Sequence, residues 1–141
     1  MKTTQALFDL SGQVAVVTGA GAGIGKAIVL RLAEAGAAVI VTDVNAQTGA
    51  GVVGEIKRRG GKADFIKADT SQAEAEDTVI QFAAERFGDL NILVNNAGIY
   101  SFKPGLDMTE DLWDRTIDIN LKGVMFFSKA AAAYMKKEAR R

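Results

Sequence analysis

The sequence predicts an α/β protein in which helices cover both faces of a parallel β-sheet, a three-layer α/β/α arrangement. Two observations predict this class. Short apolar runs alternate with longer amphipathic stretches along the 141 residues. The apolar runs are rich in Val and Ile, as expected for parallel strands that are buried on both faces. No linker, repeat or low-complexity stretch divides the chain, so we expect one domain over residues 1–141.

Four apolar runs are predicted as strands, in the order Val14–Thr18, Ala38–Thr42, Ala63–Lys67 and Ile92–Asn95. The stretches between them have helical spacing of apolar residues. The first two predicted helices are Gly25–Ala35, which stops at Gly36, and Ala46–Arg59, which stops at Gly60. A third opens after Thr70 and Ser71, both good N-cap residues, and runs to Phe87. A fourth starts near Thr109 and continues to about Glu138.

Composition excludes several classes of function. Seventeen basic and seventeen acidic residues cancel, so no global field favours nucleic acid or an anionic membrane. The chain has no cysteine and no histidine; we therefore expect no disulfide and no metal site, and any acid–base chemistry must use Tyr, Lys, Asp or Glu. The first ten residues have no signal-peptide pattern, and the longest apolar run is too short for a bilayer. We expect a cytoplasmic protein.

A glycine-rich loop is the sharpest motif. Residues 18–25, TGAGAGIG, directly follow the first strand and open the first helix. The unpaired N–H groups of a helix N-terminus suit a pyrophosphate, and glycine lets phosphates approach the backbone. The spacing is Gly19-x-x-x-Gly23-x-Gly25, whereas the stricter G-x-G-x-x-G pattern fails at Ile24. From the loop alone, a tight turn without a ligand stays an alternative.

Asp43 follows the second predicted strand, where a carboxylate can accept hydrogen bonds from the ribose of a dinucleotide. It would also repel the 2′-phosphate of NADP, by roughly 4 kcal/mol for charges about 4 Å apart. No basic residue in the loop or at Val44 offsets this charge. NAD is therefore favoured over NADP. The alternative is that Asp43 is an N-cap or loop acid.

These motifs and three others resemble those of the classical short-chain dehydrogenases/reductases. Asp69-Thr70 follows the third strand, Asn95-Asn96-Ala97-Gly98 follows the fourth, and Asn120 lies within Ile119–Gly123. The resemblance covers the chain from about Leu10 onward. It implies a Rossmann-type fold with strand order 3-2-1-4, two helices on each face, and NAD-linked hydride transfer between alcohol and ketone.

The resemblance also implies residue roles. The Asp69 carboxylate would contact the adenine amino group, the turn at Asn95–Gly98 would line the cofactor and tie the central strands together, and a helix kink at Asn120 would hold a water in a proton relay. From the residues alone, Asp69 could cap a helix and Asn120 could bond to neighbouring backbone. Asn120 is the one expected catalytic residue. The expected cofactor-binding set is Gly19, Ala22, Gly23, Ile24, Gly25, Asp43, Val44, Asp69, Thr70, Asn95, Ala97 and Gly98.

The family's catalytic serine and Tyr-x-x-x-Lys pair have no counterpart here. Tyr100 is followed four residues on by Pro104, and Tyr134 by Glu138. We therefore expect the N-terminal part of such an enzyme, inactive by itself, with an alcohol or ketone substrate bound only in a full-length form. The alternatives are a non-catalytic minimal nucleotide-binding module or scaffold, and a subunit that another chain completes.

A chain that stops before the family's fifth strand is also expected to self-associate. The fourth strand would be an unpaired apolar edge, and the fourth helix would expose some of Val124, Phe127 and Ala131. We expect a homo-oligomer formed through this strand edge or this helix.

Overall fold

The computed structural model describes residues 3–139 and contains one four-stranded parallel sheet. The strands are β1 (Val14–Thr18), β2 (Ala38–Asp43), β3 (Lys62–Lys67) and β4 (Ile92–Val94). They are arranged in the order β3-β2-β1-β4, which confirms the predicted Rossmann-type topology. In the part of the chain that the structure describes, no helix is both long enough and apolar enough to cross a membrane.

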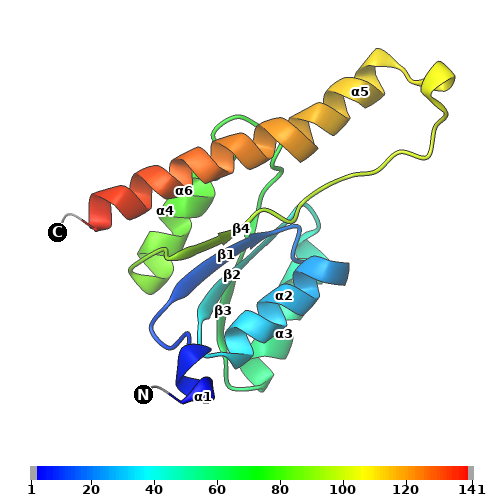
Figure 1. Ribbon diagram of the computed structural model, residues 1–141. Helices are drawn as coiled ribbons and strands as arrows, with labels where there is room; N and C mark the ends of the chain where they lie inside the picture. Colours follow the sequence, from blue (N-terminus) through cyan, green and yellow to red (C-terminus); the bar gives the residue numbers. More distant parts are fainter. Residues whose placement is uncertain (1–2, 140–141) are drawn as a thin grey trace.

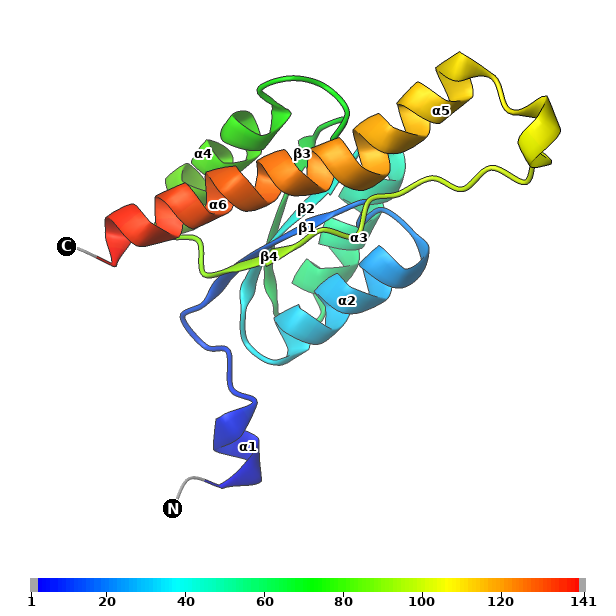
Figure 2. The same ribbon diagram turned by 45° about the horizontal axis from the view of Figure 1, so that its top comes forward.

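Helices cover both faces of the sheet (Figure 1). A short helix, α1 (Thr4–Leu7), precedes β1, and the helices after the strands are α2 (Gly23–Glu34), α3 (Ala46–Arg58), α4 (Ala75–Phe87), α5 (Glu110–Ile117) and α6 (Val124–Glu138). Helices α2 and α3 lie on one face, and α4 and α6 lie on the other (Figure 2). The predicted division into two helices on each face is confirmed.

Alternation along the strands builds two apolar cores, since successive side chains of a strand point to opposite faces. Val17 and Val41 pack under α2 and α3, whereas Val16 and Ile40 pack under α4 and α6. All four side chains are fully buried. The central strands are therefore rigid, and they fix the position of the loops that leave their carboxyl ends.

The start of α4 differs from the prediction. Residues 70 and 71 do not cap this helix, because the Asp69 carboxylate accepts hydrogen bonds from the Ser71 N–H at 3.0 Å and the Ser71 hydroxyl at 2.7 Å. This Asx-type turn competes with helix formation. The helix begins at Ala75, after Glu74 in a left-handed conformation with φ of 64°.

The predicted fourth helix is not one regular helix. Thr109 caps α5 through its hydroxyl, which accepts the Leu112 N–H at 3.4 Å. A π-helical segment, Asp118–Gly123, then separates α5 from α6. Such wide turns are common at functional positions, and this one contains Asn120. A Cβ on Gly123 would lie 2.6 Å from the Thr70 carbonyl oxygen, so glycine permits close packing at the end of the π segment.

The expected exposure of the fourth helix is wrong for two of its residues. Phe127 and Ala131 are buried against the sheet beside α4, with 0% and 2% exposure. The large apolar side chains that this segment does expose are Trp113, Leu121, Met125 and Phe126, and exposed lysines lie beside them, with Lys129 over the Phe126 ring. Strand β4 pairs with β1 alone and its side chains are half-buried, so its outer edge is free within the described residues.

Candidate nucleotide-binding site

The loop from β1 to α2 requires glycine for two different reasons. Gly19 has a φ of 63°, and a Cβ there would lie 2.8 Å from the Ala97 Cα. Gly25 is packed against the Gly19 carbonyl and the Asn96 side chain, where a Cβ would clash with both. These two glycines let the loop lie directly against the end of β4.

Gly23 faces open space. Its φ is 53°, and nothing lies within 4 Å of the position a Cβ would take. It is the first residue of α2, and the N-cap residue Ala22 makes no side-chain capping bond. Because the first N–H groups of an α-helix lack intrahelical partners, the backbone here can donate to an anion. The loop therefore fits a pyrophosphate group.

Asn96 and Thr18 join the glycine loop to the end of β4. The Asn96 side-chain amide donates to the carbonyl oxygens of Thr18, at 2.9 Å, and Gly19, at 3.0 Å. The buried Thr18 hydroxyl accepts the N–H groups of Asn96 and Ala97, both at 3.0 Å. The turn thus ties the two central strands together. The family resemblance implied this role for the Asn95–Gly98 segment, and Asn96 is the asparagine that performs it.

Asp43 lies beside the glycine loop at the carboxyl end of β2. Its Oδ2 accepts the Gly21 N–H at 2.8 Å, and its Oδ1 accepts the Asn45 N–H at 2.9 Å. The N-cap of α3 is Asn45, whose side chain accepts from Gln47 and Thr48. Asp43 therefore does not cap α3, and its carboxylate bonds to the backbone of the glycine loop and of the β2–α3 turn. Each carboxylate oxygen keeps a second lone pair for a ligand.

A groove of about 270 Å³ runs along the carboxyl edge of the sheet. Its lining includes seven of the expected cofactor residues, namely Gly19, Asp43, Val44, Asp69, Thr70, Ala97 and Gly98. Ala22, Gly23, Ile24 and Gly25 lie beside it, in the same loop and the first turn of α2. Sequence reasoning missed the remaining lining residues, which are Thr42, Ala68, Asn96, Ile99, Arg115 and Ile119.

The two other predicted residues point elsewhere. The Asn95 side chain donates to the Ser128 hydroxyl of α6 at 2.9 Å, and Asn95 does not line the groove. The Asn120 amide clasps the backbone of Ile99, accepting its N–H at 2.9 Å and donating to its carbonyl at 2.7 Å. Asn120 thereby fixes the β4–α5 connection to the π-helical segment. Its side-chain amide bonds to backbone, as the alternative stated for this residue expects.

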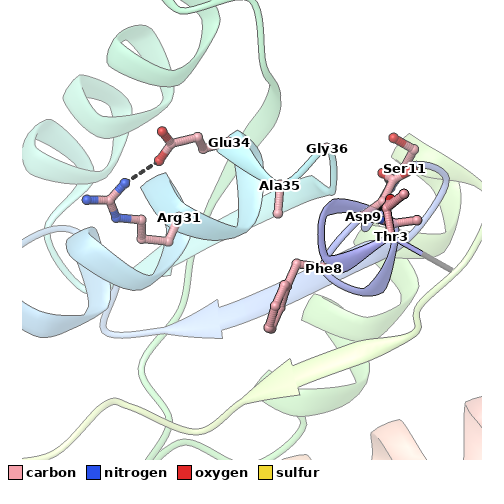
Figure 3. A pocket seen from close by; sticks show the side chains of 9 residues that line it. Thr3, Phe8, Asp9, Ser11, Arg31, Glu34, Ala35 and Gly36 are labelled. Atoms are coloured by element: carbon pink, nitrogen blue, oxygen red, sulfur yellow. Dashed lines mark hydrogen bonds and ion pairs between the residues drawn. The ribbon is translucent and has the colours of Figure 1, made fainter.

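A second hollow lies at the opposite edge of the sheet. It has a volume of about 700 Å³ and lies between the N-terminal segment and the end of α2, with Phe8, Arg31 and Gly36 among its lining residues (Figure 3). Arg31 pairs there with Glu34. None of the expected cofactor residues lines this hollow. Within residues 3–139, no group of three or more acidic side chains is placed to hold a metal ion.

The open helix start, the acid at the end of β2 and the groove at the carboxyl edge define a dinucleotide-binding α/β protein. The chain belongs to the short-chain dehydrogenase family, whose model matches residues 13–140. Members of this family bind a nicotinamide dinucleotide cofactor.

Individual relatives agree with this assignment. The chain is 43% identical over 130 residues to an uncharacterized oxidoreductase of Methylorubrum extorquens, covering 92% of this chain and 52% of that protein. It is 39% identical over 126 residues to 3beta-hydroxysteroid dehydrogenase 2 of Eggerthella lenta, covering 89% and 48%. The crystal structure of a hydroxysteroid dehydrogenase from Escherichia coli superposes with a TM-score of 0.88 at 38% identity, covering 93% and 55%. The chain therefore spans about half the length of the curated relatives it matches.

Proposed function

We propose that residues 1–141 form the NAD-binding portion of a short-chain dehydrogenase that, as a whole protein, transfers a hydride between an alcohol and a ketone. The observation that carries this proposal is the juxtaposition of Asp43 with the glycine loop, where its carboxylate accepts the Gly21 N–H at 2.8 Å. The Asp43 carboxylate thus lies between the start of α2, which can bind an anion, and the groove along the strand ends.

Different residues would bind different parts of the cofactor. Backbone N–H groups at Gly23 and Ile24 would hold the pyrophosphate, and the Asp43 carboxylate would accept the ribose hydroxyls. Asp69 and Thr70 line the far part of the groove, where a carboxylate can accept from an adenine amino group. When bound, the cofactor supplies the hydride acceptor or donor. The chain's own part is to bind and orient it.

The charge of Asp43 supports NAD over NADP, because a 2′-phosphate next to this carboxylate would be repelled. Binding of NAD, NADP and ADP, measured by calorimetry on the wild type and on Asp43→Asn, tests this choice. We expect the wild type to prefer NAD at least tenfold and the variant to lose most of that preference. The matched control is Glu34→Gln, an exposed acid at the far end of α2. Equal affinity of the wild type for NAD and NADP would overturn the preference.

We further propose that these 141 residues do not turn over an alcohol or ketone by themselves, because they contain no Tyr-x-x-x-Lys pair. A module that binds nucleotide without chemistry is one alternative. A subunit completed by another chain is a further alternative. Turnover of simple alcohols or ketones by the isolated chain would contradict the proposal. The cytoplasmic location stays a prediction.

Two features support the expected homo-oligomer. One is the free edge of β4. The other is the outer face of α5, the π segment and α6, where Leu121 and Met125 are 62% and 60% exposed. In the rod that α5, the π segment and α6 form, acidic side chains predominate at the start (Glu110, Asp111 and Asp114, against Arg115), and basic ones predominate toward the end (Lys129, Lys136 and Lys137, against Glu138). Two rods side by side in opposite directions would bring these charges into register.

A further inference from the structure

Arg115 is a cation in the groove that the family motifs do not account for. It lies on α5, which extends beyond the carboxyl ends of the strands (Figure 1), and it lines the groove with Asp43, Val44 and Asp69. Along the sequence, no cation lies in the glycine loop or at position 44 next to Asp43. Arg115 is more than seventy positions away in the sequence, and only the fold brings it to this site.

The guanidinium of Arg115 makes no ion pair or side-chain hydrogen bond within the described residues. The nearby acids are already held by other groups. Asp43 accepts from Gly21 and Asn45, and Asp69 accepts from Ser71. These bonds fix the carboxylates on the strand side of the groove. Arg115 therefore remains available to a ligand.

The groove has a second polar group without a partner. The Thr42 side chain is 1% exposed, and its hydroxyl has no hydrogen-bond partner in the described structure. Thr42 lines the same groove. Because buried hydroxyls are nearly always satisfied, a group entering the groove is expected to supply the missing bond.

Apolar side chains share the groove with the polar Thr70 and Asn96. Val44, which is 57% exposed, lines the groove from the end of β2, and Ile119 lines it from the π segment. A planar cation beside apolar side chains suits a flat aromatic ring, because a guanidinium stacks on aromatic faces and attracts their π electrons. A dinucleotide has two such rings, but the oxidised nicotinamide ring is itself a cation, whereas adenine is neutral and carries hydrogen-bonding edges for Asp69 and Thr42.

We propose that Arg115 binds the adenine ring of the dinucleotide through its planar guanidinium and so sets the affinity of the adenosine half. This inference rests on the proposed function, since it assumes that the groove receives a dinucleotide. In this proposal the Arg115 guanidinium contacts the adenine base, and it contacts neither the pyrophosphate nor the 2′-phosphate of NADP.

Binding of NAD, NADP, AMP and adenosine to the wild type, Arg115→Met and Arg115→Lys tests the assignment. Calorimetry suits the nucleotides, and NMR shift titration suits the weaker adenosine. We expect Arg115→Met to weaken all four ligands by a similar factor of about five to ten. Arg115→Lys keeps the charge but loses the plane, so it should restore only part of the affinity. Arg58→Met is the matched control, because Arg58 is an exposed arginine on α3 outside the groove.

The outcomes separate the inference from the proposed function. Unchanged affinities in Arg115→Met would overturn the inference and leave the proposed function intact. A loss for AMP and NAD without a loss for adenosine would assign Arg115 to phosphate, and a loss for NADP alone would assign it to the 2′-phosphate; either overturns the contact with the base. Absence of nucleotide binding by the wild type would overturn the proposed function and this inference together.

Discussion

Asn96 and Thr18 bind each other reciprocally at the carboxyl edge of the sheet. The Asn96 amide donates to the Thr18 carbonyl at 2.9 Å, and the Thr18 hydroxyl accepts the Asn96 N–H at 3.0 Å. Thr18 is 1% exposed, so the loss of either partner leaves buried polar groups without a bond. The glycine loop is therefore held in place by β4 before any ligand arrives.

Replacing either partner should destabilise the protein. Thr18→Val leaves the N–H groups of Asn96 and Ala97 without an acceptor, and Asn96→Ala leaves two carbonyls without a donor. We expect each change to lower the free energy of unfolding by about 2 kcal/mol in urea denaturation. Asn95→Ala is the control, because it removes one exposed bond to Ser128 and should cost about 0.5 kcal/mol. Equal losses for Asn95→Ala and Asn96→Ala would contradict the interpretation.

The strands could be predicted from sequence because alternating apolar and amphipathic stretches determine which residues form them. Their order could be predicted only because the motifs resemble those of a known family, whose strand order the resemblance implies. The errors arose at one local turn and at one long-range packing contact. The Asx turn of Asp69 delays α4, and Gly123 packs against the Thr70 carbonyl where the regular helix becomes a π segment.

Some residues of the site could likewise be predicted from sequence and others could not. Gly19, Asp43 and Asp69 were predicted to bind the cofactor, and they do line one groove, because residues that follow parallel strands meet at one edge. Arg115 and Thr42 carry no local signal. An arginine within a polar helix and a threonine within a strand look ordinary until the fold places both at the groove. Asn95 was predicted to bind the cofactor but does not line the groove, because its side chain bonds to Ser128, which its motif does not reveal.

Phe127 anchors α6 to the sheet. It is fully buried among Val16, Ile40 and Val79 in the core under α4 and α6. Phe127→Ala should lower the free energy of unfolding by about 3–5 kcal/mol, because it removes a large buried side chain and leaves a cavity. Phe126→Ala, the adjacent and 42% exposed phenylalanine, should change it by less than about 1 kcal/mol. Similar effects of the two changes would show that α6 does not pack as described.

The pH dependence of stability should reflect an ion pair between α2 and α3. The hydrogen bond from Lys26 lowers the pKa of Glu55 below its ordinary value, and the two charged groups lie 2.9 Å apart. Because the folded-state pKa is lower than the unfolded one, the pair stabilises the fold above pH about 4.3. This contribution is lost as the pH falls through the lowered pKa.

Thermal unfolding of the wild type and of Lys26→Met between pH 7 and pH 3 tests this expectation. The difference between their melting temperatures should be present at neutral pH and should shrink as Glu55 becomes protonated. Lys57→Met is the control, since Lys57 is an exposed lysine of α3 that makes no ion pair in the described residues. A difference that stays constant down to pH 3 would rule out this linkage.

Self-association should depend on the outer face of the α5–α6 rod or on the edge of β4. If the rod is the interface, Met125→Glu replaces an exposed apolar side chain by a charge and should convert the oligomer to monomer, because burying an unpaired carboxylate is costly. If the strand edge is the interface, Ile92→Lys should have this effect instead. Sedimentation at micromolar concentration distinguishes the two, with Asp77→Asn on α4 as a control. A wild-type chain that sediments as a uniform monomer would exclude both interfaces.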